Sequence, residues 1–280
     1  ENIRVSNDLE AAAGGKDLVV FVVPSHVMRE VAGRAAQYLH PAAVVVSAAK
    51  GIENKTHLRM TGVLAEVLPA HASRLAVVSG PSFAAEVSRG LPTVVSAASD
   101  DPEVAGFLQQ VFATPFFRVY TNPDVIGVEL GGAVKNVIAI ASGIVDGLGL
   151  GLNSRAALIT RGLTEIRRLG LRLGANAHTF AGLSGVGDLV LTCTGALSRN
   201  HTVGKMIGEG KTLEEILAHM SMVAEGVKTA RSVYNLSRKI GVEMLISHSV
   251  YAVLYESLKP RDAVYQLMTR TLKSELEDVE

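Results

Sequence analysis

Apolar and polar positions alternate in blocks along the first part of the chain. Five short runs are almost continuously apolar and rich in β-branched or aromatic residues, at 17–23, 43–48, 75–79, 93–97 and 116–120. Runs of this kind are typical of strands buried on both faces of a sheet, as in parallel α/β folds. Helical patterns lie between them, one capped by Ser25 and running to about Leu39, another over 101–113. The pattern predicts a doubly wound α/β architecture.

The pattern changes after residue 122, and no later segment is typical of a strand. Helix-boundary signals recur instead: Asn153 or Ser154 as the cap of a helix ending at Gly170, Thr212 and Glu215 as a capping box, a helix over 225–239 ahead of Gly241, and Pro260 at a first helical position. We therefore predict an α/β domain over residues 1–122 and an all-α domain over 123–280.

One expected feature of a dinucleotide-binding α/β domain is missing, namely an opening strand that runs into a Gly-x-Gly-x-x-Gly turn. Gly147, Gly149 and Gly151 follow a helical pattern, and Gly185 and Gly187 lack the third glycine. The chain also begins with Glu rather than Met. We expect an N-terminal truncation of roughly 60 residues, about two strand–helix units. Such a truncation would leave a sheet edge unpaired.

Composition narrows the classes of function. The 280 residues include 27 basic and 27 acidic side chains, so no global field favours nucleic acid or an anionic membrane surface. The single cysteine, Cys193, cannot form an internal disulfide, which favours a reducing, cytoplasmic location. We expect no signal peptide and no transmembrane segment, because the longest apolar runs are short. No set of side chains has metal-ligand spacing.

Residues 127–143 form a helical pattern that Lys135 and Asn136 interrupt. Leu130, Val134 and Val137 recur on one helix face. Lys135 has two interpretations. It is either a side chain that reaches solvent from an exposed stripe, or a lysine held in a cleft as a general acid or base. The spacing alone does not separate these alternatives.

A second segment, residues 182–204, suits an anion. Ser198 is a good helix N-cap, which places Arg199 and Asn200 in the first turn beside free backbone N–H groups. The alternative is an ordinary cap with a solvated arginine. Asp188, in a glycine-rich turn, is either another cap or an acceptor that orients a substrate hydroxyl or the Lys135 ammonium. Cys193 is interpreted as a packed thiol.

A third group follows the predicted strands, where open α/β sheets bind their ligands. It comprises residues 24–26, Lys50 with Gly51, and residues 80–82. For Lys50 the alternative is a lysine in a surface loop.

Read together, these segments resemble the NAD(P)-dependent glycerol-3-phosphate dehydrogenases of bacteria. The matching stretches keep the family's order across essentially the whole chain; they are VVPSHVMREV, SAAKGIE, SGPSFAAEV, ELGGAVKNVIAIASGIVDGLG, NSRAALITRGLTEIRRLG, AGLSGVGDLVLTCTGALSRNHTVG, VAEGVKTA and GVEM. One small departure is Leu245, where the family carries proline. The resemblance implies a partial Rossmann-like dinucleotide-binding domain followed by an all-helical substrate-binding domain.

The resemblance also implies roles for particular residues. Lys135 would donate and accept the proton. The implied substrate-binding residues are Lys50, Gly80, Ser82, Asn136, Asp188, Thr192, Ser198, Arg199 and Asn200. The implied cofactor-binding residues are Lys50, Ala84, Arg199, Val223 and Glu225. The cofactor would be NAD or NADP, and the substrate a small phosphorylated molecule used in phospholipid synthesis. A homodimer is one assembly that the resemblance allows.

Two alternatives stay open at this point. One is a related 3-hydroxyacid or ketopantoate-type dehydrogenase with the same two-domain plan, although its substrates lack the phosphate that the segment at Ser198 suits. The other is a non-catalytic fragment that folds and pairs through its helices.

Overall fold

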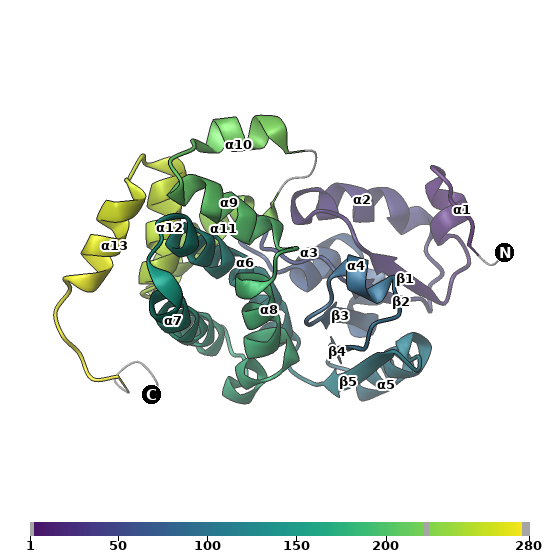
Figure 1. Ribbon diagram of the computed structural model, residues 1–280. Helices are drawn as coiled ribbons and strands as arrows, with labels where there is room; N and C mark the ends of the chain where they lie inside the picture. The colour runs from purple at the N-terminus through teal and green to yellow at the C-terminus, as the bar shows by residue number, and fades with distance from the viewer. Residues whose placement is uncertain (1–2, 221–223, 276–280) are drawn as a thin grey trace.

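The five predicted strands are all present and form a single sheet in sequence order; they are β1 (Leu18–Phe21), β2 (Val44–Ser47), β3 (Leu75–Ser79), β4 (Thr93–Ala98) and β5 (Phe117–Asn122). The computed structural model describes residues 3–220 and 224–275 (Figure 1). The strands β1, β2 and β3 run parallel, β4 is antiparallel to β3, and β5 is parallel to β4. The sheet is therefore mixed. The connection between β3 and β4 holds only the one-turn helix α4 (Ala84–Val87), and a connection this short suits antiparallel neighbours.

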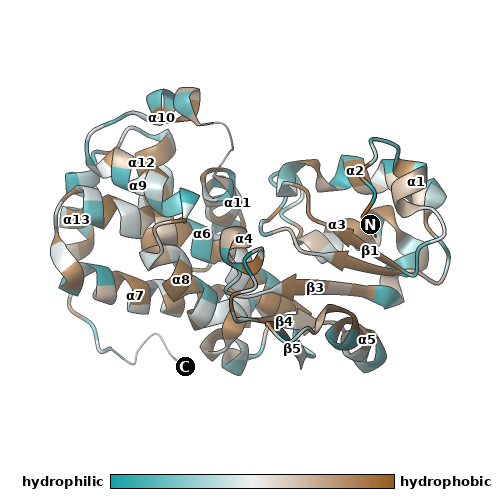
Figure 2. Cartoon of the chain, turned by 45° about the vertical axis from the view of Figure 1, so that its right-hand side comes forward, coloured by the Kyte–Doolittle hydropathy of each residue, from teal (hydrophilic) through white to brown (hydrophobic). Residues whose placement is uncertain are grey.

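Helices cover both faces of this sheet, as the continuously apolar strands predicted. The helices α2 (Met28–Ala35) and α3 (Met60–Val67) pack against one face, and α5 (Pro102–Phe112) packs against the other. Figure 2 shows the hydrophobic strand β3 between α3 and α5. β1 pairs only with β2, so its outer edge has no strand partner among the described residues.

The rest of the described chain is helical, as predicted, and contains no strand. One further helix, α1 (Leu9–Ala13), precedes the sheet. The α-helices that follow the sheet are α6 (Val125–Gly147), α7 (Gly151–Arg172), α8 (Asp188–Thr194), α9 (Arg199–Gly208), α10 (Leu213–His219), α11 (Glu225–Ile240), α12 (Leu245–Tyr255) and α13 (Pro260–Met268). The helices α7, α8, α9, α11 and α12 pack around α6, which lies beside the sheet at its N-terminal end and at the centre of the helical group (Figure 1).

The helix α6 is buried around almost its whole circumference, whereas the sequence indicated one apolar face. Its length and composition would suffice to cross a membrane, but 94% of that stretch is buried inside the protein. Small residues allow this packing. A Cβ added to Gly143 would lie 2.0 Å from the His201 carbonyl oxygen, and one added to Gly204 of α9 would lie 2.0 Å from the Ile140 carbonyl oxygen. The backbones of α6 and α9 are therefore in direct contact.

The predicted helix boundaries are partly confirmed. The capping box of Thr212 and Glu215 is present, Gly241 ends α11 in the left-handed conformation, and Pro260 begins α13. Two predicted caps are wrong. Ser25 makes no cap, and α7 begins at Gly151 and continues to Arg172, with the Ser154 hydroxyl donating to the Leu150 carbonyl inside it. In both places a serine beside an apolar run has a hydrogen-bond partner other than a free helix N–H.

Candidate functional site

A buried group of two lysines, a carboxylate and a hydroxyl lies between the sheet and the helical region. Lys135 on α6 is 5% exposed and donates from Nζ to Asp188 Oδ1 at 2.7 Å and to Thr192 Oγ1 at 2.6 Å. Lys50, which follows β2, donates from Nζ to Asp188 Oδ2 at 2.6 Å. One carboxylate therefore bridges two ammonium groups that are far apart in the sequence.

The glycines of α6 explain how these groups meet. A Cβ added to Gly132 would lie 2.5 Å from Ser79 Oγ at the end of β3 and 3.6 Å from Lys50 Cγ. One added to Gly131 would lie 2.3 Å from the Ser184 carbonyl oxygen, just before α8. Because these positions carry no side chain, the sheet and the backbone leading to Asp188 both reach α6 within one turn of Lys135.

The environment of Lys135 lowers its pKa from the usual value near 10.5 to about 7. Burial is the largest cause, since it penalises the charged form, and the nearby Lys50 ammonium lowers the pKa further. Asp188 acts in the opposite direction, through its charge and its hydrogen bond. The amine and ammonium forms are therefore both accessible near neutral pH. The alternative of a solvated, exposed Lys135 is wrong, and so is the alternative of Asp188 as a simple cap.

The segment after β3 borders this group. The Gly80 carbonyl accepts from Lys50 Nζ at 3.2 Å and from Ser82 Oγ at 3.1 Å. Gly80 has a φ of 145°, which favours glycine, and an added Cβ would lie 3.0 Å from the Val95 Cα. Ala84 is exposed at the start of the helix α4. The structure thus brings Lys50, Gly80 and Ser82 together, as expected for ligand-binding residues beyond strand ends.

The N-terminus of α9 forms the second part of the site. Ser198 is its cap, as predicted, with Oγ accepting from the His201 N–H. Arg199 is exposed and forms no ion pair within the described chain. The Asn200 side chain is buried, with Nδ2 donating to Asn136 Oδ1 at 3.0 Å and Oδ1 accepting from Gly226 N at 2.9 Å. Asn136 and Asn200 therefore link α6, α9 and α11 and hold the first turn of α9 beside Lys135.

A hydrogen bond across the two halves of the chain was not anticipated. Ser25 Oγ donates to Glu225 Oε2 at 2.8 Å, and a Cβ added to Gly51 would lie 2.5 Å from Ser25 Oγ. The available signal was the position of Ser25 just beyond β1, where ligand-binding residues gather. Glu225, which the resemblance implied as a cofactor-binding residue, thus lies close to Ser25 beyond the end of β1. Val223 lies outside the described residues.

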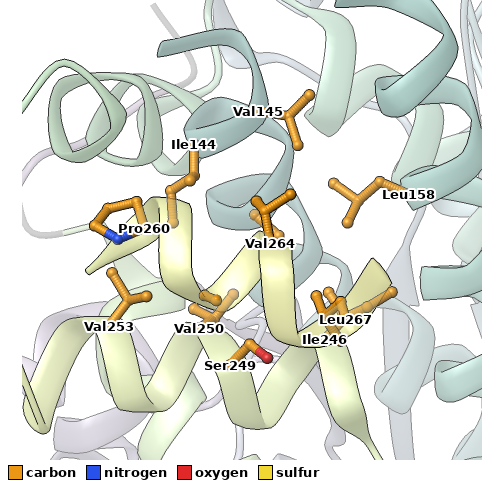
Figure 3. A pocket seen from close by; sticks show the side chains of 12 residues that line it. Ile144, Val145, Leu158, Ile246, Ser249, Val250, Val253, Pro260, Val264 and Leu267 are labelled. Atoms are coloured by element: carbon orange, nitrogen blue, oxygen red, sulfur yellow. The ribbon is translucent and has the colours of Figure 1, made fainter. Parts of the chain in front are cut away.

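The lone cysteine, the acidic and histidine side chains as possible metal ligands, and the apolar pocket offer no competing chemistry in the described chain. Burial raises the pKa of the Cys193 thiol to about 12, which supports a packed thiol rather than a nucleophile. The described residues contain no group of three or more side chains suited to a metal. An apolar cavity of about 40 Å³ lies between α6, α7, α12 and α13 (Figure 3). Its lining, which includes Ile144, Val253 and Val264, carries no charged side chain, so it offers nothing to an anion.

Comparison with known proteins gives consistent matches along the chain. The family model for the NAD-dependent glycerol-3-phosphate dehydrogenase N-terminus matches residues 1–105, and the model for the C-terminus of the same family matches residues 124–265. Glycerol-3-phosphate dehydrogenase [NAD(P)+] of Geobacter sulfurreducens is 60% identical over 274 residues, which cover 98% of this chain and 82% of that protein. The Myxococcus xanthus enzyme is 55% identical over 280 residues, covering 100% and 84%.

Solved structures agree with these matches. The crystal structure of glycerol-3-phosphate dehydrogenase from Coxiella burnetii has a TM-score of 0.90 and 42% identity, covering 94% of this chain and 80% of that one. A ketopantoate reductase from Ralstonia eutropha, with a TM-score of 0.51 and 15% identity, shares only the fold. The Rossmann-like sheet, the helical region and these relatives together lead to one conclusion: the chain belongs to the family of NAD(P)-dependent glycerol-3-phosphate dehydrogenases.

Proposed function

We propose that this oxidoreductase interconverts dihydroxyacetone phosphate and sn-glycerol 3-phosphate, with Lys135 as the general acid and base. The observation that carries the proposal is the buried Lys135 ammonium, held by Asp188 and Thr192 beside Lys50. Reduction of a ketone builds negative charge on its oxygen. A cation placed there stabilises that charge and supplies the proton. In the reverse direction the neutral amine of Lys135 takes the hydroxyl proton.

The phosphate group would bind at the N-terminus of α9. The exposed guanidinium of Arg199 and the free N–H groups of the first turn suit a dianion there. Ser198 and Asn200 fix the orientation of that turn. Lys50, Gly80, Ser82 and Asn136 would border the carbon skeleton, while Asp188 and Thr192 hold the two lysines. Binding energy from the phosphate would then position C2 of the substrate against Lys135.

The residues beyond the strand ends suit the nicotinamide end of the cofactor. Val22 follows β1 and is 72% exposed, so it offers an apolar surface for a ring three residues before Ser25, whose hydroxyl bonds the Glu225 carboxylate. When bound, NADH or NADPH supplies the hydride. We assign its contacts to Lys50, Ala84, Arg199, Val223 and Glu225. Among the described residues no glycine-rich turn joins a strand to a helix, so these contacts concern the nicotinamide end alone.

A comparison of substrates tests the proposed reaction. The purified protein should oxidise NADH or NADPH far faster with dihydroxyacetone phosphate than with ketopantoate, because only the former carries a phosphate for the α9 site. Faster turnover of ketopantoate would refute the assignment. An absence of turnover with either substrate, in protein shown to be folded by circular dichroism, would favour the non-catalytic alternative.

The pH dependence should differ between the two directions. Reduction requires the Lys135 ammonium, so its kcat/KM should fall as pH rises through about 7. Oxidation requires the amine, so its kcat/KM should rise through the same pH and then level off. Initial rates in both directions, measured across this range in buffers of constant ionic strength, would show the two limbs. Parallel profiles in the two directions would contradict the role of Lys135.

We also propose that the regions 1–122 and 123–280 act as separate cofactor-binding and substrate-binding domains. The enzyme would work in the cytoplasm, a reducing compartment that is consistent with its single, buried cysteine. There it would supply glycerol phosphate for phospholipids. We also predict a homodimer. Light scattering on the purified protein would test this, and the mass of a monomer would contradict it.

A further inference from the structure

The loop that follows Lys50 is closed on itself. It leaves the end of β2, crosses residues 51–59 and enters α3. Ile52 and Arg59 form an antiparallel bridge, and the Glu53 N–H donates to the Leu58 carbonyl at 2.9 Å. His57, with a φ of 64°, makes the reversal. Lys50 therefore stands at the base of a hairpin-like loop, and the position of its ammonium depends on how that loop is held.

One arm of the loop is fixed to the helical region. Ile52 is 2% exposed and belongs to the same hydrophobic core as α6 and α11, although it follows a strand of the sheet. Its carbonyl accepts from the Ser232 hydroxyl on α11 at 2.8 Å. The Asn54 side chain adds a bond to the Lys228 carbonyl at 3.4 Å.

The other arm is held by Glu129 of α6, fewer than two helical turns before Lys135. Its carboxylate is almost wholly buried and accepts from the Thr61 N–H at 2.8 Å, from Thr61 Oγ1 at 2.5 Å and from Arg59 Nη1. Thr61 is in the first turn of α3, a helix whose own cap residue supplies no side-chain bond. Glu129 thus caps a helix of the other domain and pairs with the residue that closes the loop. A buried carboxylate with three such donors is well compensated.

We propose that Glu129, together with Arg59, is a positioning residue for the reaction: it fixes the loop so that the Lys50 ammonium stays on Asp188. The inference rests on the proposed function, in which Lys50 and Lys135 share that carboxylate. α6 carries both Glu129 and Lys135, so one rigid helix sets the distance between the loop and the proton-transfer group. Displacement of a positioned group by about 1 Å can cost about a hundredfold in rate.

The test replaces Glu129 with Gln, which keeps the size but removes the charge and turns an amide toward Arg59. We expect kcat to fall about 10- to 100-fold. In the oxidation direction, the rise of kcat/KM with pH (the oxidation limb) should move to higher pH by about one unit. The reason is that the displaced Lys50 no longer lowers the pKa of Lys135, and Asp188 pairs with Lys135 alone. Amide exchange over residues 51–61 should accelerate, a readout that needs no cofactor.

Two further variants separate positioning from other effects. Arg59→Met removes a positive charge where Glu129→Gln removes a negative one, yet it should shift the oxidation limb in the same direction. Arg59→Met also tests the inference if Glu129→Gln fails to fold. Val63→Ala creates a cavity beneath α3 and should lower the melting temperature without moving the limb. An unmoved limb and a normal kcat in folded Glu129→Gln would overturn the inference while leaving the proposed function intact. Activity retained on loss of Lys135 would instead refute the proposed function.

Discussion

Replacement of Lys135 by Ala should lower kcat by about 10²- to 10⁴-fold in both directions, the usual contribution of a general acid or base. The protein should remain folded, because Asp188 keeps its ion pair with Lys50 at 2.6 Å and is not left as an isolated buried charge. Stopped-flow measurement of nicotinamide absorbance with saturating substrate would give kcat directly. Lys205→Ala on α9, which removes an exposed lysine, is the matched control and should leave kcat unchanged.

Small primary amines provide a second arm for this prediction. Lys135→Ala leaves a space lined by Asp188 and Thr192, both of which bind an ammonium in the unaltered protein. Added ethylamine should therefore restore part of the lost rate, and Lys135→Ala without amine should lose the pH dependence near 7. A nearly normal kcat in Lys135→Ala would contradict the role of Lys135 as general acid and base. So would a rescue by ethylamine that raises the folded fraction of the variant without raising its kcat.

The sequence predicted the elements better than their connections. A strand covered on both faces is apolar whichever way its neighbour runs, so the sequence of β4 (Thr93–Ala98) did not show that it is antiparallel to β3. Two helix starts predicted from single residues were wrong: Ser25 and Ser154 (predicted as Asn153 or Ser154) bond to other partners, although the single-serine cap Ser198 is present. In contrast, the box of Thr212 with Glu215 depends on two residues at fixed spacing, which makes it a stronger signal.

The candidate site shows the same limit. For Lys135 the local pattern left both a solvated and a buried side chain open, because a helical repeat does not show whether nearby glycines pack against another backbone. The bridge from Lys50 to Asp188 joins residues separated by 138 positions, and Ser25 and Glu225 are separated by 200. Contacts of that range depend on the tertiary fold. The resemblance of whole segments to one family assigned Lys50 and Asp188 to one site, whereas the bond between Ser25 and Glu225 was not anticipated.

Replacement of Asp188 by Asn should be the second most damaging change, with kcat/KM lowered about a hundredfold. The amide keeps the shape but leaves Lys50 and Lys135 facing each other without a counter-charge, which is costly in a buried site. Because Asp188 raises the pKa of Lys135, the loss of its charge should lower that pKa from about 7 to a smaller value. At neutral pH Lys135 would then be largely an amine, so reduction should suffer more than oxidation.

The direction of the pH shift distinguishes this variant from the one at Glu129. In Asp188→Asn the oxidation limb should move to lower pH, whereas displacement of Lys50 in Glu129→Gln should move it to higher pH. Thr192→Val provides a matched comparison, since it removes one acceptor of the Lys135 ammonium but no charge, and should cost about tenfold with a smaller downward shift. Opposite shifts are expected because Asp188 contacts Lys135 directly, whereas Glu129 acts on it through the position of Lys50. A shift in the same direction in both variants would contradict the proposed positioning of Lys50 by Glu129.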